Sequence, residues 1–336
     1  MTERSASNAA SLPLVSVVIE GYNQGRDLGV ADATIKRLAA QDYPTSRVEL
    51  VLVGSPPQIA DWQARYADGH GFRAIKYLSF DEMRYYDFKN AGTTVAAGEI
   101  VAMTDSDVLP RRRWISAIVE TITGGADASM GPSLFGDGVT YHADSVLMRM
   151  TASITWGWIL GPPDPETGRP RSRGFHDHNI AMRADVWRDH KYRTDLGRIM
   201  SSPLLFHDLL RDGKRVRFHP HQQAEHQFSL RYWLISLQYR YGHEVYRLRR
   251  ADRNYPNQWI TRTGIFEPLV TYGWHVMLDV PKWFRLNRAL GKNVVITTAL
   301  LPAFVLVSAF ARSFEMAGMI WTMVRPQESR RWAESI

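Results

Sequence analysis

The sequence predicts an α/β fold in which a mostly parallel sheet is flanked by helices, with a helical and partly apolar extension at the C-terminus. In the first half of the chain, short β-branched apolar runs alternate with helical patterns of about 12 residues, as in βαβ units. Near the C-terminus lies a run of 17 uncharged residues, 294–310. The alternation predicts the sheet, and the uncharged run predicts the apolar extension.

The expected elements of the first half follow one another along the chain. Strands are expected in four short and mostly apolar segments: 14–19, 48–53, 74–78 and 99–104. Helices are expected where apolar residues recur at helical spacing: 27–41, 58–70 and 85–97, the last capped by Gly98. Ligands bind at the carboxyl ends of parallel strands. These ends are residues 20–23, 54–55 and 105–107.

Composition excludes several classes of protein. Hydrophobic residues make up 45% of the 336 residues and charged residues 22%, which is ordinary globular usage and excludes global disorder. The chain has no cysteine, so disulfide scaffolds, thiolate metal sites and cysteine nucleophiles are excluded. The net charge of +7 favours acidic partners such as phosphates or an anionic membrane. No signal peptide opens the chain, so we expect a cytoplasmic protein. A location at the inner face of the cell membrane is the alternative.

The C-terminal apolar run leaves three readings open. Arg312 and Glu315 interrupt it before a second apolar run, 316–324, and basic residues flank both sides. Seventeen residues is about the lower limit for crossing a bilayer. The segment 293–324 either packs on the rest of the chain or on another subunit, or lies in the plane of a membrane. A true span is the least favoured reading.

The motif Asp105-Ser106-Asp107 is the central polar feature of the sequence. Because side chains alternate along an extended segment, both carboxylates are expected to point the same way at the carboxyl edge of the sheet. Two hard oxygen ligands suit Mg²⁺ or Mn²⁺ better than zinc. Such an ion would neutralise a diphosphate leaving group. A strand-end turn with solvated carboxylates is the alternative.

Several segments, taken in order, resemble family 2 glycosyltransferases, which have the GT-A fold. Residues 15–23 (Val-Ser-Val-Val-Ile-Glu-Gly-Tyr-Asn) are similar to the opening strand of that family. Residues 89–92 (Lys-Asn-Ala-Gly) and then 97–107 are similar to its helix, strand and Asp-X-Asp element. Residues 179–183 resemble the segment beside its acceptor site, and 207–216 resemble its acidic pair, helix and glycine turn.

The resemblance covers residues 13–250 and implies a domain plan. It implies a GT-A domain at 13–255, with a nucleotide-binding half at 13–110 and an acceptor half at 111–255. A flexible tail at 1–12 precedes this domain, and a helical extension at 256–336 follows it. Within the acceptor half, the breaker-rich segment 161–174 is expected to be either a lid or a disordered connection.

The resemblance also implies roles for individual residues. Asp107 would bind the metal, with Asp105 contacting the ribose or sharing the ion. His226 would complete the metal or diphosphate shell, and Asp208 would be the general base that deprotonates the acceptor hydroxyl. The residues expected to bind the nucleotide are Glu20, Tyr22, Asn23, Gly54, Arg84, Asn90, Asp105 and Ser106. Glu20 and Gly54 stand where the sequence departs from the family, and a satisfied strand-end glutamate is the alternative for Glu20. Structural alternatives stay open: a capped histidine for His226, the N-cap of a helix starting near Leu209 for Asp208, and a solvated helix start for Arg84.

The sequence departs from the family at several positions. Its first strand ends in Glu20 where the family usually has proline, and Gly54-Ser55 replace an acidic pair that reads the base. His207 stands where the family has glutamate. No Gln-X-X-Arg-Trp motif occurs, which argues against a processive polysaccharide synthase.

Two further clusters allow a functional and a structural reading. Five arginines with interleaved tyrosines suggest either a solvated helix face or a contact with anionic lipid or phosphate: Arg240, Arg247, Arg249, Arg250 and Arg253. The segment His176-Asp177-His178 could bind a metal ion, but no further ligand pair at zinc-like spacing supports a metal site there. No motif that binds nucleic acid accompanies the arginines.

The resemblance therefore implies an inverting, metal-dependent glycosyltransferase of the hexosyltransferase class. It would move one sugar from a nucleoside diphosphate sugar to a hydroxyl of a cell-envelope, lipid-linked or secondary-metabolite acceptor, with Mg²⁺ or Mn²⁺ as cofactor. Membrane contact through 293–324 and oligomerisation stay open as further associations. The alternatives are a non-catalytic subunit that docks on a partner, and a nucleotidyltransferase. The sequence specifies neither the sugar, the base nor the acceptor.

Overall fold

The computed structural model describes the residues in ten stretches: 12–24, 30–82, 84–136, 145–163, 170–172, 174–194, 201–251, 253, 255 and 257–334. The chain forms two compact units. The first comprises residues 1–141, 163–194 and 202–227, and the second comprises 142–162, 195–201 and 228–336. The expected tail lies outside the described residues apart from residue 12, as do 164–169 and 173 of the expected lid.

The first unit is built on a mixed sheet with the strand order β3-β2-β1-β4-β10-β6-β11-β9. Its strands are β1 (Val15–Glu20), β2 (Val48–Gly54), β3 (Ala74–Ser79), β4 (Ile100–Asp105), β6 (Ala128–Met130), β9 (Pro170–Ser172), β10 (Ile180–Arg183) and β11 (Val216–Phe218). The first four are mutually parallel, whereas β10 runs antiparallel to both β4 and β6. The predicted α/β fold and the parallel half of the sheet are confirmed.

Strands β1, β2 and β4 are apolar over nearly their whole length because both faces of the sheet are covered. Every residue of these three strands is buried. Helix α4 (Tyr85–Val95) packs on β1 and β2. At Gly92 a Cβ atom would lie 2.3 Å from Val18 Cγ1, so the helix approaches the sheet through a glycine. Continuous burial explains the unbroken apolar runs in the sequence.

The other helices of the first unit differ from expectation mainly at their ends. They are α2 (Val30–Ala39), α3 (Pro56–Arg65), α5 (Trp114–Thr123), α7 (Ala184–Asp189) and α8 (Ser201–Arg211), with short turns η1 (Tyr22–Gln24), η2 (Thr45–Arg47) and η3 (Gly69–Gly71). Helix α3 begins at Pro56 because proline suits the first helical position, and Ser55 is its N-cap. The expectation that Gly98 caps α4 is wrong. The cap is Ala96, and Gly98 is needed because a Cβ atom there would lie 2.5 Å from the Ser16 backbone nitrogen.

A second, three-stranded sheet in the first unit brings distant segments together. Its order is β5-β12-β7, formed by β5 (Val108–Pro110), β12 (Ala224–Gln227) and β7 (Ser133–Gly136). Strand β5 follows the Asp-X-Asp motif directly. In the register of the antiparallel pair, His226 lies opposite Val108.

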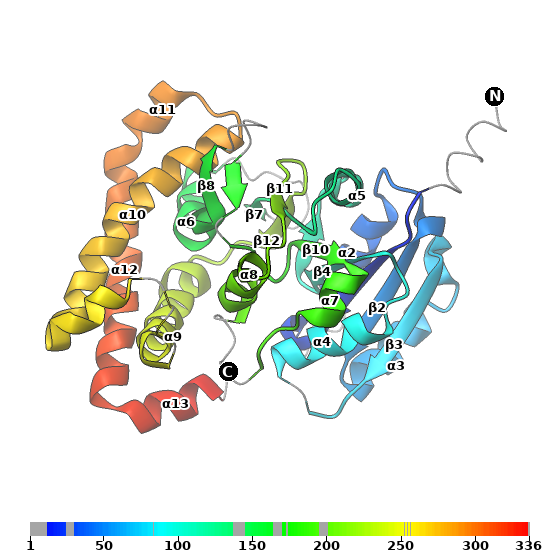
Figure 1. Cartoon of the computed structure of the whole chain (residues 1–336), viewed down its shortest axis with the longest axis horizontal. Helices are drawn as coiled ribbons and strands as arrows, with labels where there is room; N and C mark the ends of the chain where they lie inside the picture. Colours follow the sequence, from blue (N-terminus) through cyan, green and yellow to red (C-terminus); the bar gives the residue numbers. More distant parts are fainter. Residues whose placement is uncertain are drawn as a thin grey trace. The chain divides into compact units, whose positions relative to one another are not determined.

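The second unit is mainly helical. Its elements are α6 (Val146–Trp156), η4 (Gly157–Ile159), the π-helical turn η5 (Tyr232–Ser236), α9 (Leu237–Ala251), η6 (Gln258–Phe266), α10 (Glu267–Ala289), α11 (Val294–Ala299), α12 (Leu301–Val324) and α13 (Pro326–Glu334). Strand β8 (Leu160–Pro163) follows η4. Helix α12 packs against both α9 and α10 (Figure 1).

Helix α9 lies in the second compact unit. Its contact with α12 is close because both helices have a glycine at the crossing. A Cβ atom at Gly242 would lie 1.9 Å from the Glu315 carbonyl oxygen, and one at Gly318 would lie 2.0 Å from the Tyr239 carbonyl oxygen. The first compact unit accordingly ends at residue 227.

Candidate active site

The carboxyl ends of β1 and β4 bring two acidic residues side by side. In the parallel register Glu20 pairs with Asp105, and both side chains are buried. The Asn23 amide joins them, because its Nδ2 donates to Glu20 Oε1 at 3.0 Å and to Asp105 Oδ2 at 2.8 Å. The Tyr22 backbone N–H also donates to Glu20, at 2.5 Å. The edge expected to form the site therefore holds an ordered polar cluster.

Asp105 is held by donors from helix α4. The Tyr85 hydroxyl lies 2.8 Å from its Oδ2 and 3.0 Å from its Oδ1, and Lys89 Nζ donates to Oδ1. Burial, and then the nearby Asp105 carboxylate, raise the pKa of Tyr85 well above its ordinary value, so the phenol stays protonated and donates. Asp105 is 3% exposed, so the carboxylate is a fixed part of the structure.

Lys89 is a fully buried cation, 0% exposed, and belongs to this cluster. Its ammonium group pairs with Asp105 at 2.5 Å and donates to the Asp177 carbonyl oxygen at 2.9 Å. Burial lowers the pKa of Lys89, but the carboxylates of Asp105, Glu20 and Asp177 outweigh that effect and raise it overall. Lys89 belongs to the motif quoted for the family resemblance, yet the sequence reasoning assigned it no role.

Asp107 does not share the surroundings of Asp105. Residues 106 and 107 form a turn between β4 and β5, so the alternation expected of an extended segment ends at Asp105. The Asp107 side chain is 36% exposed, and its Oδ2 lies 3.8 Å from Nδ1 of the buried His226. The pairing of β5 with β12 brings these two residues together.

The chemistry of this pair fits a hard divalent cation. A carboxylate oxygen and an imidazole nitrogen are both ligands that Mn²⁺ accepts, and the half-exposed carboxylate leaves room for further oxygen ligands from a substrate. Among the residues that the structure describes, no group of three or more His, Asp or Glu side chains is arranged to hold a metal.

His178 lies against His226 and joins the site to the segment His176-Asp177-His178. The two rings meet edge to face with centroids 4.3 Å apart, and His178 Nε2 lies 2.7 Å from Ser133 Oγ. Burial, together with the nearby His226, lowers the pKa of His178, so its ring is neutral at pH 7. The same burial would raise the pKa of Asp177, but His178 and Lys89 outweigh it and lower it.

Gly54 and Ser55, at the end of β2, are packed by a side chain that the sequence reasoning missed. Gln58 Nε2 donates to the Gly21 carbonyl oxygen at 2.7 Å, and its Oε1 accepts the Ser55 N–H at 2.8 Å. A Cβ atom at Gly54 would lie 2.8 Å from Gln58 Oε1. Gln58 thus links the ends of β1 and β2. Its contacts lie beside Gly54 and Ser55, the positions at which the family usually has an acidic pair.

Two other residues expected to bind the nucleotide lie at the same edge. The Tyr22 ring packs edge to face on Tyr85, with centroids 5.8 Å apart. Ser106 is fully buried, and its carbonyl oxygen accepts a hydrogen bond from the Thr34 hydroxyl at 2.7 Å. The structure therefore groups Glu20, Tyr22, Asn23 and Asp105, with Ser106 next in the chain.

Arg84 and Asn90 contact a different segment, residues 190–194. Arg84 is the N-cap residue of α4, and its Nη1 donates to the Thr194 carbonyl oxygen at 3.1 Å. Both ends of the Asn90 amide bind the backbone of Tyr192, with Nδ2 donating at 2.8 Å and Oδ1 accepting at 3.1 Å. In this structure the two side chains hold α4 to that segment.

Asp208 lies within α8, because the helix begins at Ser201. The alternative that Asp208 caps a helix starting near Leu209 is therefore wrong. Its carboxylate, 34% exposed, pairs with Arg211 at 2.9 Å. The neighbouring Phe206 packs on Phe175, one residue before His176, with ring centroids 5.9 Å apart. His207, next to Asp208, is exposed.

The arginine cluster of α9 is not a uniform solvated face. Arg240 and Arg249 are buried in the second unit, 5% and 3% exposed. Arg249 Nη1 donates to Glu267 at 3.3 Å and to Thr271 at 2.7 Å, and Arg250 pairs with the same glutamate at 2.7 Å. Much of the cluster therefore stabilises the helical unit.

Comparison with known proteins agrees with this architecture. The model of glycosyl transferase family 2 matches residues 16–190. A glucosyl-dolichyl phosphate glucuronosyltransferase of Haloferax volcanii is 23% identical over 255 residues, which is 72% of this chain and 78% of that protein.

Two solved structures have a similar fold. One is the mannosyltransferase PcManGT from Pyrobaculum calidifontis in complex with GDP-Man and Mn²⁺, with a TM-score of 0.59 and 17% identity over 94% of this chain and 88% of that one. The other is GalNAc-T7 with UDP, GalNAc and Mn²⁺, with a TM-score of 0.51 and 16% identity over 66% of this chain and 45% of that one. The predicted GT-A fold is confirmed. Because the family model covers more than half of the chain, the protein belongs to glycosyl transferase family 2 and is a glycosyltransferase.

Proposed function

We propose that the protein transfers one sugar from a nucleoside diphosphate sugar to a hydroxyl acceptor, with inversion at the anomeric carbon and with a divalent cation. The observation that carries the proposal is the pairing of Asp107 with His226 beside the buried Asp105–Lys89 cluster. This arrangement lies at the carboxyl edge of the sheet, where α/β proteins bind ligands. Similar folds have been solved with GDP-Man and Mn²⁺ and with UDP, GalNAc and Mn²⁺, which supports a nucleotide-sugar donor.

In this proposal Asp107 and His226 hold Mg²⁺ or Mn²⁺. The bound ion would neutralise the negative charge that develops on the departing diphosphate. Asp105 is 3% exposed and accepts hydrogen bonds from Tyr85, Lys89 and Asn23. Its part is to keep the turn that carries Asp107 in place, and Glu20, Tyr22 and Asn23 form the adjoining wall for the nucleoside.

Asp208 is the proposed general base. The acceptor oxygen attacks the anomeric carbon while the bond from that carbon to the diphosphate breaks, and the acceptor proton passes to the carboxylate. A carboxylate suffices because the hydroxyl becomes acidic only as the new bond forms. Arg211 Nη1 lies 2.9 Å from the Asp208 carboxylate and holds its side chain in place.

The acceptor that we favour is lipid-linked. The relative from Haloferax volcanii is described as acting on a glucosyl-dolichyl phosphate. The second unit of this chain exposes many apolar side chains, as a protein working beside lipid would. We therefore propose a hexosyl transfer to a polyprenyl-phosphate-linked sugar at the membrane.

The test is a donor screen by mass spectrometry, with a panel of nucleoside diphosphate sugars and short polyprenyl-phosphate glycans, in Mn²⁺ and in EDTA. We expect transfer from at least one donor in Mn²⁺ and none in EDTA. Asp208→Asn should lose transfer by about 10²-fold or more, whereas Asp212→Asn, one turn further along, should retain it. Full transfer by Asp208→Asn would contradict the role of Asp208 as general base. Equal transfer in EDTA would contradict the requirement for a divalent cation.

A further inference from the structure

Exposed apolar side chains gather in one part of the second unit. Of the 16 large apolar side chains that are exposed among the described residues, twelve lie between Trp259 and Val324. They come from η6, α10, α11 and α12: Trp259, Ile265, Phe266, Leu269, Met277, Val294, Val295, Ile296, Leu306, Phe310, Ile320 and Val324. Several are extreme, such as Leu306 at 73% and Val295 at 71%. Contiguous exposed apolar surface on a protein usually marks an interaction site.

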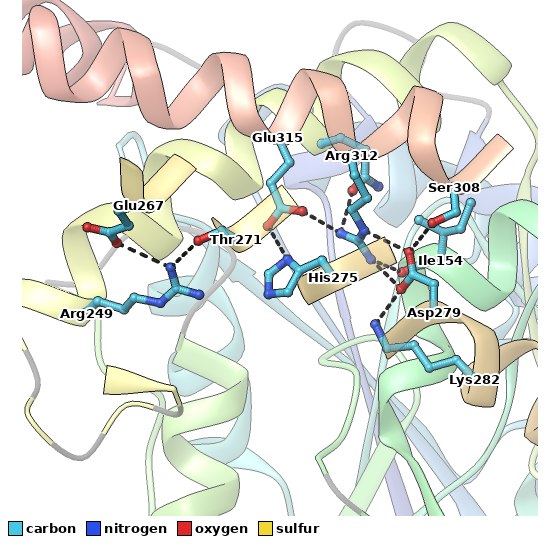
Figure 2. A network of polar contacts seen from close by, with 11 residues as sticks. Ile154, Arg249, Glu267, Thr271, His275, Asp279, Lys282, Ser308, Arg312 and Glu315 are labelled. Atoms are coloured by element: carbon cyan, nitrogen blue, oxygen red, sulfur yellow. Dashed lines mark hydrogen bonds and ion pairs between the residues drawn. The ribbon is translucent and has the colours of Figure 1, made fainter. Parts of the chain in front are cut away.

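Within the part of the chain that the structure describes, α12 is the one helix long and apolar enough to cross a membrane. Its inner face nevertheless carries a buried ion network (Figure 2). All five N–H donors of Arg312 are used: the guanidinium group binds both oxygens of Asp279 at 2.9 Å, Glu315 at 2.8 Å, the Ile154 carbonyl oxygen at 3.1 Å and Gln238 at 3.2 Å. These partners come from α6, α9 and α10 as well as from α12 itself.

The network is closed and balanced in charge. Lys282 also pairs with Asp279 at 2.7 Å, and His275 Nδ1 lies 2.8 Å from Glu315 Oε1. Burial lowers the pKa of His275 and outweighs the nearby glutamate, so the ring is neutral at pH 7. Two cations therefore face two anions. Pulling α12 out of the bundle to span a bilayer would leave charged groups without partners in hydrocarbon, which is strongly unfavourable.

The outer face of α12 is free of charge. Arg312 and Glu315 are the only charged residues in its 24-residue sequence, and both are buried, at 6% and 2% exposure. Helix α11 has no charged residue. Helix α10 packs against α12, and both helices also pack on α6 (Figure 1).

Basic residues lie at both ends of this apolar face. Arg288 and Lys292 flank α11, and Arg330 and Arg331 lie on α13, beyond the C-terminal end of α12. An apolar helical face bordered by lysine and arginine matches an anionic bilayer surface, with apolar side chains at the acyl boundary and cations at the headgroups.

We propose that the face formed by η6, α10, α11 and α12 docks the second unit in the plane of an anionic lipid bilayer, and that α12 does not cross it. The proposal is independent of which sugar is transferred. It predicts binding to lipid by the protein without donor, acceptor or metal.

Vesicle flotation tests the proposal directly on the full chain. We expect binding to phosphatidylcholine vesicles that contain phosphatidylglycerol, and weaker binding when the anionic lipid is left out or salt is raised. Leu306→Gln/Phe310→Gln should lower the partition coefficient by about tenfold or more, because two large apolar contacts with the acyl region are lost. The matched control is Leu210→Gln in α8, since Leu210 is 48% exposed, like Phe310, and should bind like the parent protein.

A second measurement separates the in-plane arrangement from a span. The chain has no cysteine, so Leu306→Cys can carry an environment-sensitive fluorophore at a single position. We expect a blue shift with anionic vesicles, no shift for the same label on Leu210→Cys, and release of the bound protein by alkaline carbonate.

Four results would overturn the proposal. Retention after carbonate washing would mean that a helix spans the bilayer. Absence of binding to anionic vesicles would contradict the proposed lipid contact. Unchanged binding in Leu306→Gln/Phe310→Gln would contradict the contact of this face with lipid. A stable dimer in the absence of vesicles, abolished by that double variant, together with no vesicle binding, would assign the face to a second copy of the chain.

Discussion

Replacing Lys89 by methionine tests the buried ion pair on which the candidate site is built. The substitution keeps the length and most of the volume of the side chain but removes its charge. Asp105, which is 3% exposed, would lose the ammonium group that lies 2.5 Å from it. The Asp177 carbonyl oxygen would lose its donor as well.

The size of the effect follows from this geometry. Removing one partner of a buried pair costs about 3–5 kcal/mol. The Tyr85 hydroxyl and the Asn23 amide still donate to Asp105, which places the expected loss at the lower end, about 3 kcal/mol. For a domain of this size the melting temperature of the first unit should fall by about 6–12 °C.

Differential scanning calorimetry of Lys89→Met, with Lys36→Met as the control, measures this change. Lys36 is exposed on α2, and its substitution should change stability by less than about 0.5 kcal/mol. The double variant Lys89→Met/Asp105→Asn removes the stranded charge and should be about 1–2 kcal/mol more stable than the sum of the single changes predicts. A loss below about 1 kcal/mol in Lys89→Met, or strict additivity in the double variant, would refute the reasoning.

Three more outcomes are expected. Arg312→Leu leaves two carboxylates buried in the second unit and should cost about 3–5 kcal/mol, seen in urea unfolding as an earlier transition of that unit; a shift no larger than that of an exposed arginine would contradict the network. Burial would raise the pKa of Glu315, but His275 and Arg312 outweigh it and lower the pKa from 4.5 to about 2, so this carboxylate stabilises the fold above pH 4.5 and the contribution is lost as pH falls toward 2. Circular dichroism during acid titration should show the second unit unfolding in that window, and an unchanged profile in Glu315→Gln would count against it. Asn90→Ala removes two hydrogen bonds to the Tyr192 backbone and should cost about 1–2 kcal/mol in thermal unfolding; no change would mean that the contact is not formed in solution.

The elements predicted most accurately are those whose burial is uniform. Strands β1, β2 and β4 were predicted to within one residue at each end, because a short β-branched run buried on both faces has few alternatives. The grouping of Glu20, Asn23 and Asp105 followed from the same logic, since parallel strands share a carboxyl edge.

The features that the sequence reasoning missed depend on contacts between distant segments. The burial of Lys89 cannot be read from local pattern, because lysine is tolerated there only through partners on β4 and at Asp177. From the sequence alone, Gln58 is an ordinary helix residue. Its role depends on the ends of β1 and β2 lying beside it, which the local sequence does not indicate. The close crossing of α9 and α12 at Gly242 and Gly318 likewise cannot be predicted from the spacing of apolar residues.

The most direct test of the central claim is titration calorimetry of the protein with nucleoside diphosphates, with Mn²⁺ and with EDTA, in the parent chain and in Asp107→Asn. We predict that at least one nucleoside diphosphate binds in Mn²⁺, that EDTA weakens this binding by about tenfold or more, and that Asp107→Asn reproduces the EDTA result while its melting temperature stays close to that of the parent protein. Equal affinity with and without the metal, or undiminished Mn²⁺-dependent binding in Asp107→Asn, would contradict the claim that this carboxylate and His226 form the cation site of the enzyme.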